Sequence, residues 1–269
     1  MRQLKNNIID EYINYVSGAS ESPAAYHFWS IATAIAASLK RHVWIDRGTF
    51  KLKPNLFTVL VGRPGIGKGT AINPVCALLR EASTANILAD RQTMEYILET
   101  MSKGFPSQAI STSGGVQFGV DSSVLISAAE LSVFISASQL TLPALNELWE
   151  AKDGTFDYGT RTKGAWKIKD ACTSLLGGST ASWLIDCLPK NAVGGGFTRR
   201  VNFVFARDRA QVIPWPTVNH TDIKAKLVND LQHVNYNLHG EVKFTIKSAK
   251  LFTEFYNSIT PLEFEDEAT

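Results

Sequence analysis

The chain has 269 residues, 45% of them apolar and 19% charged, so its length and composition fit one large domain or two small ones with a substantial core. An aromatic content of 10% argues against extended disorder, and the longest apolar run, 31–39, is too short to span a membrane. The net charge of +2 excludes a strongly basic surface and confines any nucleic-acid contact to a local patch. Three cysteines without CxxC spacing, and a start without a signal-peptide pattern, predict a cytoplasmic protein without disulfides or a zinc site.

The predicted elements alternate between helical spacing and short apolar runs, which is typical of an α/β protein. The first elements in chain order are helices over 4–17 and 22–41 and short strands at 42–46 and 49–53. Runs that are apolar without alternation favour strands of a parallel sheet buried on both faces, and they occur at 56–61, 124–128, 172–176 and 201–206. We therefore expect a four-strand parallel core flanked by helices. A helix over 221–235, a strand over 241–246 and a helix over 248–257 follow.

A glycine-rich loop, Gly-Arg-Pro-Gly-Ile-Gly-Lys-Gly-Thr, directly follows the apolar run at 56–61 and opens a helix. Between a buried strand and a helix, glycines let successive N–H groups converge on phosphate oxygens, and the helix N-terminus adds positive charge. Lys68 is then placed to reach the β- and γ-phosphates of a nucleotide such as ATP. The predicted nucleotide-binding residues of this loop are Gly62, Pro64, Gly65, Ile66, Gly67, Lys68, Gly69 and Thr70.

Magnesium binding departs from the usual pattern at this loop. Gly69 follows the lysine, where Ser or Thr usually supplies a hydroxyl to Mg²⁺. Thr70, one residue further on, is the nearest candidate for a Mg²⁺ ligand. Pro74 lies in the second turn of the following helix, which we expect it to kink.

Polar residues follow two of the predicted strands. Glu130 comes at the tip of the run at 124–128, where a carboxylate can polarise a water molecule; the alternative is a surface glutamate that caps the next helix. Ala129 stands where an aspartate usually supports Mg²⁺, and Asp121 is too far upstream to replace it. Ser179 and Thr180 follow the run at 172–176, where a hydroxyl can contact the γ-phosphate or act as a helix N-cap.

Two arginines, Arg199 and Arg200, directly precede the run at 201–206. Paired cations before a buried strand are costly unless they meet an anion, so an arginine here can stabilise the charge on a neighbouring subunit's nucleotide. The alternative is a pair of exposed loop cations.

Together these features resemble a ring-forming P-loop ATPase of the AAA+ class, and more closely the ATPase module of phage and mobile-element replication proteins related to primase-associated helicases. The resemblance covers about 23–256 and rests on the glycine-rich loop and on the segments 26–29, 41–46, 54–55, 145–150, 177–180 and 194–200. It implies a P-loop NTPase fold with bound ATP and Mg²⁺ in a homo-oligomeric, hexamer-like ring. The implied catalytic residues are Lys68 in the P-loop, Glu130 at the strand tip, Thr180 (or Ser179) as polar sensor and Arg200 as arginine finger.

Alternation at 155–160 and 165–169 predicts a β-hairpin inserted before the run at 172–176, with Phe156, Tyr158, Trp166 and Ile168 on one side. In ring helicases similar to this chain, such a hairpin grips single-stranded DNA in the central channel. The DNA-binding residues that this resemblance implies are Arg161, Lys163 and Lys167. The alternative is a solvated hairpin whose lysines serve solubility.

These observations lead to the hypothesis of an ATP-hydrolysing DNA motor in phage or mobile-element replication, with a primase or other replication proteins as partners and, if phage-encoded, the host cytoplasm as location. Its segments are an N-terminal helical segment (1–53), the ATPase core (54–210) and a partial lid-like region (211–269). Ala129 and Gly69 favour an alternative, a nucleotide-dependent scaffold or loader with weak hydrolysis. A third alternative is a nucleotide kinase, because Gly67–Thr70 and Gly104–Pro106 are similar to adenylate kinase motifs.

Overall fold

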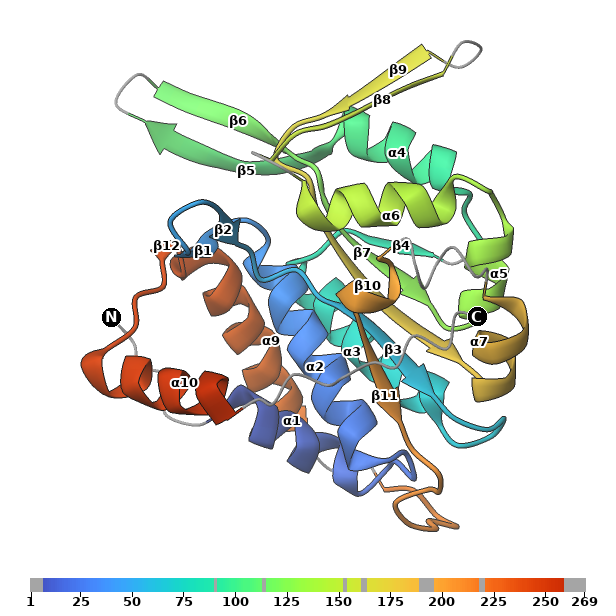
Figure 1. Cartoon of the computed structure of the whole chain (residues 1–269). Coiled ribbons are helices and arrows are strands. Elements are labelled where there is room, and N and C mark those ends of the chain that lie inside the picture. The colour runs from blue at the N-terminus through green and yellow to red at the C-terminus, as the bar shows by residue number, and fades with distance from the viewer. Residues whose placement is uncertain are drawn as a thin grey trace.

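A computed structural model describes residues 7–89, 91–112, 115–151, 154–160, 164–188, 196–217 and 221–258. It has an α/β fold in which five parallel strands form a central sheet flanked by helices (Figure 1). The strands are β3 (Phe57–Val61), β4 (Ile87–Ala89), β7 (Ser123–Ala128), β10 (Cys172–Ser179) and β11 (Val201–Phe205). The predicted α/β class with a central parallel sheet is confirmed. The expected count of four strands is wrong, because β4, three residues long and only partly buried, adds a fifth strand at one edge.

The order of the strands in space is β11-β3-β10-β7-β4, so β10 lies between β3 and β7. Ser179 pairs with Val61 in register, and Gly177 pairs with Ala128. Because all five strands are parallel, these residues lie at the same edge of the sheet. The segments that follow β3, β7 and β10 therefore emerge side by side at this carboxyl edge.

Neighbouring residues within each strand point to opposite faces of the sheet. Val59 and Leu175 belong to one apolar cluster, and Leu60 and Leu176 belong to another. The first cluster includes residues of α4 (Met94–Lys103), α5 (Leu131–Ser136) and α6 (Thr141–Glu150). The second includes residues of α1 (Ile8–Ser17), α2 (Ala24–Leu39), α3 (Lys68–Ala82) and α9 (Thr221–Asn237). The three predicted segments of the chain thus share this second core.

Most predicted helices are present with small changes at their ends. The helix that follows the glycine-rich loop, α3, is continuous from Lys68 to Ala82 and contains Pro74 in its interior. A short helix, α7 (Ala181–Cys187), follows β10, and a 3₁₀ turn, η2 (Thr198–Arg200), precedes β11. None of the described helices is long and apolar enough to span a membrane.

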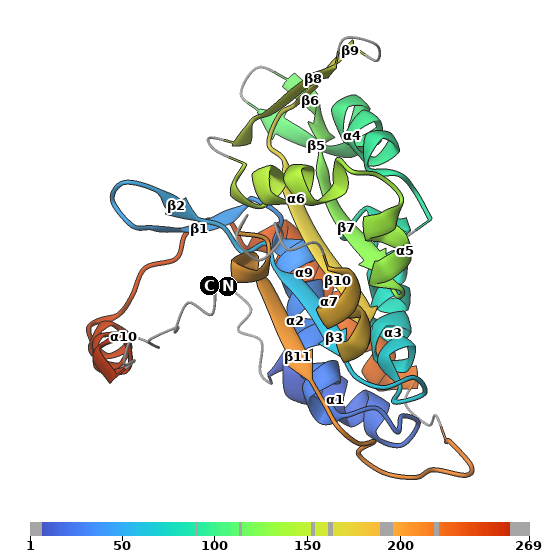
Figure 2. The same cartoon turned by 45° about the vertical axis from the view of Figure 1, so that its right-hand side comes forward.

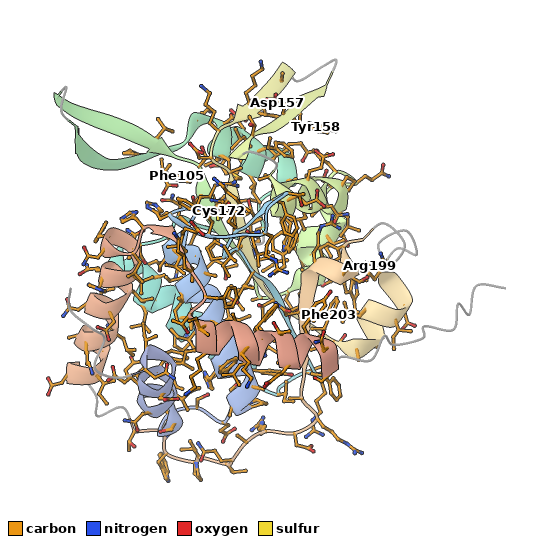
Figure 3. All side chains as sticks on the ribbon, turned by 60° about the vertical axis from the view of Figure 1, so that its left-hand side comes forward. Phe105, Asp157, Tyr158, Cys172, Arg199 and Phe203 are labelled. Atoms are coloured by element: carbon orange, nitrogen blue, oxygen red, sulfur yellow. The ribbon has the colours of Figure 1, made fainter. Side chains whose placement is uncertain are left out.

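Two hairpins extend from the end of the molecule opposite the carboxyl edge (Figures 1 and 2). The predicted one is confirmed as β8 (Phe156–Thr160) paired with β9 (Gly164–Ile168). Its aromatic side is also as expected, with the ring centroids of Tyr158 and Trp166 5.7 Å apart. The second, β5 (Phe105–Thr112) with β6 (Gly115–Asp121), was not predicted. Figure 3 shows Phe105, Asp157 and Tyr158 together at this end.

A small sheet stands beside the central one, formed by β1 (Val43–Asp46), β2 (Lys51–Leu52) and β12 (Gly240–Glu241) in the order β12-β1-β2. The predicted strand over 241–246 is wrong, because pairing is confined to its start and Val242 and Phe244 are exposed. After it, α10 (Ile246–Ser258) has no buried residue and stands away from the sheet (Figure 2).

Candidate functional site

The glycine-rich loop, residues 62–70, lies at the carboxyl edge of the sheet between β3 and α3. Gly65 has φ 78° and Gly67 has φ 100°, conformations that side chains disfavour, and Gly67 is the N-cap of α3. Ile66 is buried in the cluster beneath the loop, whereas Pro64 is exposed. The loop is therefore anchored by one apolar side chain and curls over the N-terminus of a helix of 15 residues.

Three side chains from distant parts of the chain hold two carbonyl groups of this loop and that of Val61, the residue before it. The Tyr26 hydroxyl donates to the carbonyl of Val61 at 2.6 Å, and the Ser22 hydroxyl donates to that of Gly67 at 2.7 Å. The Arg209 Nε donates to the carbonyl of Gly65 at 3.1 Å. Since these carbonyl oxygens already have donors, their dipoles are fixed away from any anion that the loop's N–H groups would bind.

Arg209 is itself held by Glu21. Its Nη1 lies 2.5 Å from the Glu21 carboxylate, which also accepts from the backbone N–H of Ile213 at 2.8 Å. The sequence does not single out Ser22, Glu21 or Arg209, and it marks Tyr26 only as part of the segment 26–29 on which the resemblance rests. No local pattern marks them, because their partners lie between 35 and 192 positions away.

Lys68 is the first residue of α3, and its Nζ donates to the carbonyls of Gly62 at 2.8 Å and Arg63 at 3.2 Å. Burial lowers the pKa of Lys68, and the charge of Glu130 acts in the opposite direction. The ammonium group is thus held by two carbonyls of the loop, within electrostatic reach of the Glu130 carboxylate. Its role at phosphate oxygens stays a prediction.

Glu130 lies two residues after the end of β7, at the carboxyl edge, and its side chain is exposed. It occupies the N-cap position of α5, but its side chain makes no capping hydrogen bond, which disfavours the reading of Glu130 as a helix cap. The backbone next to Glu130 packs tightly against the end of β10. A Cβ built on Gly178 would lie 2.6 Å from the Ala129 carbonyl oxygen and 3.5 Å from the Lys68 side chain. The tips of β7 and β10 and the start of α3 are therefore in close contact.

Ser179 and Thr180 lie at the tip of β10, beside the loop. The Ser179 carbonyl accepts from the N–H of Gly62 at 3.2 Å, and its buried hydroxyl donates to the Thr180 carbonyl at 3.3 Å. The Thr180 hydroxyl accepts from the N–H of Trp183 at 3.3 Å and is the N-cap of α7. The capping role considered for Thr180 is confirmed, and its sensor role stays a prediction.

The first turn of α3 also contains the residues that bear on a metal ion. Thr70 is exposed there, and a Cβ on Gly69 would meet nothing within 4 Å. Asp121 is the last residue of β6, just before β7 and at the opposite edge, where it pairs with Lys40 at 2.7 Å. Among the described residues, no group of three or more His, Cys, Asp or Glu side chains is placed to hold a metal. A Mg²⁺ ion at this edge would thus depend on Thr70 and on phosphate oxygens.

Arg200 lies at the other edge of the sheet, because it precedes β11 and Val201 pairs with Phe57 at the start of β3. It forms an ion pair with Glu150, donates to the Gly196 carbonyl at 2.8 Å and lies over the Trp149 ring. The structure therefore brings Lys68, Glu130, Ser179 and Thr180 together within one chain and leaves Arg200 apart. Arg199, the other arginine of the pair, is exposed (Figure 3).

The hairpin that carries the predicted DNA-binding residues lies at the same edge as Arg200. Lys167 is exposed on β9, and Lys169 is exposed just after it, on the side away from the aromatic face. Arg161 and Lys163 lie outside the described residues. Neither a protein-family model nor a curated protein matches this chain.

Proposed function

We propose that the chain is an ATP-hydrolysing, helicase-like motor with a P-loop NTPase fold that acts on DNA in phage or mobile-element replication. One observation carries the ATPase part: a glycine-rich loop at the carboxyl edge of a parallel sheet, with three carbonyls held by Tyr26, Ser22 and Arg209. A loop fixed in this way matches the anion-binding turn that the motif predicts.

The residues around the loop fit ATP and Mg²⁺. Phosphate oxygens would accept from the N–H groups of 65–70 and from Lys68, and Thr70 would contact the metal. ATP supplies the phosphoanhydride bond that is cleaved, and Mg²⁺ neutralises charge on its oxygens. Lys68 binds and orients the phosphates, Glu130 orients the attacking water and takes up its proton, and Ser179 or Thr180 positions that water by hydrogen bonding.

The DNA part of the proposal rests on the resemblance and on the exposed cations of the β8–β9 hairpin. In a ring, Arg200 of one subunit would act as the finger at its neighbour's nucleotide. That role requires Arg200 to leave its ion pair with Glu150, which makes the Arg200–Glu150 pair a switch between engaged and disengaged states.

A nucleotide-dependent scaffold or loader is the second candidate. Ala129 and Gly69 lack the carboxylate and hydroxyl that usually support Mg²⁺, and the Thr180 hydroxyl is engaged as a helix cap. These features favour nucleotide binding with slow turnover. The two candidates share the loop and differ in the rate of hydrolysis.

ATP turnover with and without single-stranded DNA tests the proposal. The proteins are the wild type, Lys68→Ala, Arg200→Ala and, as a matched control, Lys224→Ala on α9. The motor predicts turnover stimulated by DNA, loss of turnover in the first two variants, and wild-type turnover in the control. Mixing Lys68→Ala with Arg200→Ala should restore part of the activity, because mixed rings contain complete sites. Nucleotide binding without turnover would favour the loader, and absence of both would contradict the proposal.

A further inference from the structure

A cavity of about 880 Å³ lies at the edge of the sheet opposite the glycine-rich loop. One wall is the β1–β2 hairpin with its turn, and the other is the end of α6. The hairpin cradle, as we name it, is formed by Arg41, Phe50, Lys51, Lys53 and Trp149, all of which line the cavity. Its volume lies within the range of ligand-binding pockets, and of the side chains that line it only Glu150, the partner of Arg200, has a part in the proposed ATPase cycle.

Cations converge in the hairpin cradle. Lys51 and Lys53 lie on one face of the hairpin, with their Nζ atoms 5.1 and 4.7 Å from the centroid of the Trp44 ring. Arg41 lies behind them and donates to the Ala171 carbonyl at 2.6 Å. Burial lowers the pKa of Lys53, and the charges of Arg41 and Lys51 lower it further. An anion bound between these groups would relieve that mutual repulsion.

Three carboxylates also line the cavity, and two of them have partners of their own. Asp46 accepts from the backbone N–H of Gly48 at 2.7 Å, and Glu150 is paired with Arg200. Asp170 is the third, and its charge opposes the lowering of the pKa of Lys53. The lining thus holds three cations and three carboxylates, and since Arg200 neutralises Glu150 from outside the cavity, an excess of one positive charge remains, with Lys51 and Lys53 on the hairpin side.

Aromatic side chains complete the hairpin cradle. Phe50 is 59% exposed beside the hairpin turn, and Trp149 lies on the opposite wall. The ring of an exposed phenylalanine can stack on a nucleic-acid base, while the two lysines beside it bind phosphates of the same strand. That combination is typical of single-strand binding, because paired bases hide their faces.

The hairpin cradle also adjoins the root of the β8–β9 hairpin. The Arg41 guanidinium donates to the carbonyls of Ala151 and Ala171, which flank that insertion. Cys172, at the start of β10, is buried near Lys53 and Arg41 (Figure 3). A nucleic-acid strand leaving the hairpin cradle would therefore pass the exposed Lys169, just after β9, and Lys167 on β9.

We propose that the hairpin cradle binds single-stranded nucleic acid, with Lys51 and Lys53 contacting backbone phosphates and Phe50 stacking on a base. This inference rests on the proposed function for its biological context, because it adds a second contact to the track that begins at the β8–β9 hairpin. Its physical basis is independent of the nucleotide site.

Fluorescence anisotropy of labelled oligo-dT and oligo-U, each about 20 nucleotides long, tests the inference with the full chain and no ATP. Affinity is measured between about 50 and 200 mM salt. We expect the Lys51→Gln, Lys53→Gln double variant to reduce the slope of log affinity against log salt by about 1.4, or about 0.7 for each lost phosphate contact. Phe50→Ala should weaken binding about fivefold or more with the slope unchanged.

Two substitutions elsewhere serve as controls, since both side chains are exposed. Lys224→Gln on α9 and Phe205→Ala on β11 should bind as the wild type does. Binding of either strand supports the inference, and the tighter of the two identifies the nucleic acid. Three results would overturn it: no single-strand binding by the wild type, an unchanged salt slope in the double lysine variant, or duplex bound as well as single strand with no effect of Phe50→Ala.

The same proteins separate this inference from the proposed function. The hairpin cradle variants should bind ATP with wild-type affinity, because the cavity and the glycine-rich loop lie at opposite edges of the sheet. A wild type that binds single strands but not ATP would refute the proposed function and leave the inference standing.

Discussion

Replacing Gly62 with alanine would put a methyl group into a filled space between the glycine-rich loop and α2. A Cβ there would lie 2.5 Å from the Tyr26 hydroxyl, 3.0 Å from the Ala206 carbonyl oxygen and 3.1 Å from the Ile66 Cγ2. Since non-bonded atoms prefer separations of about 3.5–4.0 Å, the loop or the helix must shift. Overpacking of this kind costs about 1–3 kcal/mol, and we expect the upper half of that range because one contact is backbone.

A second substitution tests whether the clash with the Tyr26 hydroxyl causes the destabilisation of Gly62→Ala. Tyr26→Phe removes the nearest atom but also the hydrogen bond to Val61, which costs about 0.5–1.5 kcal/mol because the Val61 carbonyl still accepts from the N–H of Ala206 at 3.1 Å. The double variant should therefore be less destabilised than the sum of the singles, by about 1 kcal/mol. Urea unfolding of the four proteins measures this coupling. Gly69→Ala is the matched control in the same loop, because its Cβ would meet nothing within 4 Å. Strict additivity, or a Gly62→Ala variant as stable as the wild type, would refute the reasoning.

Three further predictions follow from the same region. Gly69→Ser has room for its side chain and supplies the missing hydroxyl, so it should strengthen Mg²⁺-dependent ATP binding in titration calorimetry; an unchanged dependence on Mg²⁺ would count against it. Ser22→Ala removes the donor to the Gly67 carbonyl and should destabilise the chain by about 1 kcal/mol in urea, whereas Ser17→Ala, which loses an exposed bond, should not. Burial lowers the pKa of His27 from 6.5 to about 4, so the unfolded chain binds the proton more tightly. The free energy of unfolding should then fall by up to about 3 kcal/mol as the pH drops from 6.5 to about 4. In His27→Gln this contribution to the pH dependence should be absent, and an equal fall in the variant would contradict the prediction.

The sequence predicts best where the signal is local. The loop between β3 and α3 follows from a buried strand, glycines and a helix start within residues 57–70, and the β8–β9 hairpin follows from alternation and a short turn. The aromatic pairing of Tyr158 with Trp166 is set by that register. These features needed no knowledge of the rest of the chain.

The features that sequence analysis missed depend on contacts over long distances or on weak patterns. β4 has three residues, of which only Leu88 is buried, so no apolar run marks it. Arg209 gains its place at the loop through Glu21, 188 positions earlier in the chain. Arg200, expected to act at a neighbouring subunit's nucleotide, lies at the opposite edge from the loop of its own chain and pairs with Glu150, 50 positions earlier; its role in trans stays a prediction.

The central claim is that the glycine-rich loop binds a nucleotide through Lys68. Equilibrium titration of the full chain with Mg-ATP tests it most directly, with Lys68→Ala and the α9 control Lys224→Ala measured beside the wild type. The account predicts saturable binding to the wild type and the control, and an affinity at least about tenfold lower in Lys68→Ala, or about 1.4 kcal/mol. No binding by the wild type, or equal affinity in Lys68→Ala, would contradict it.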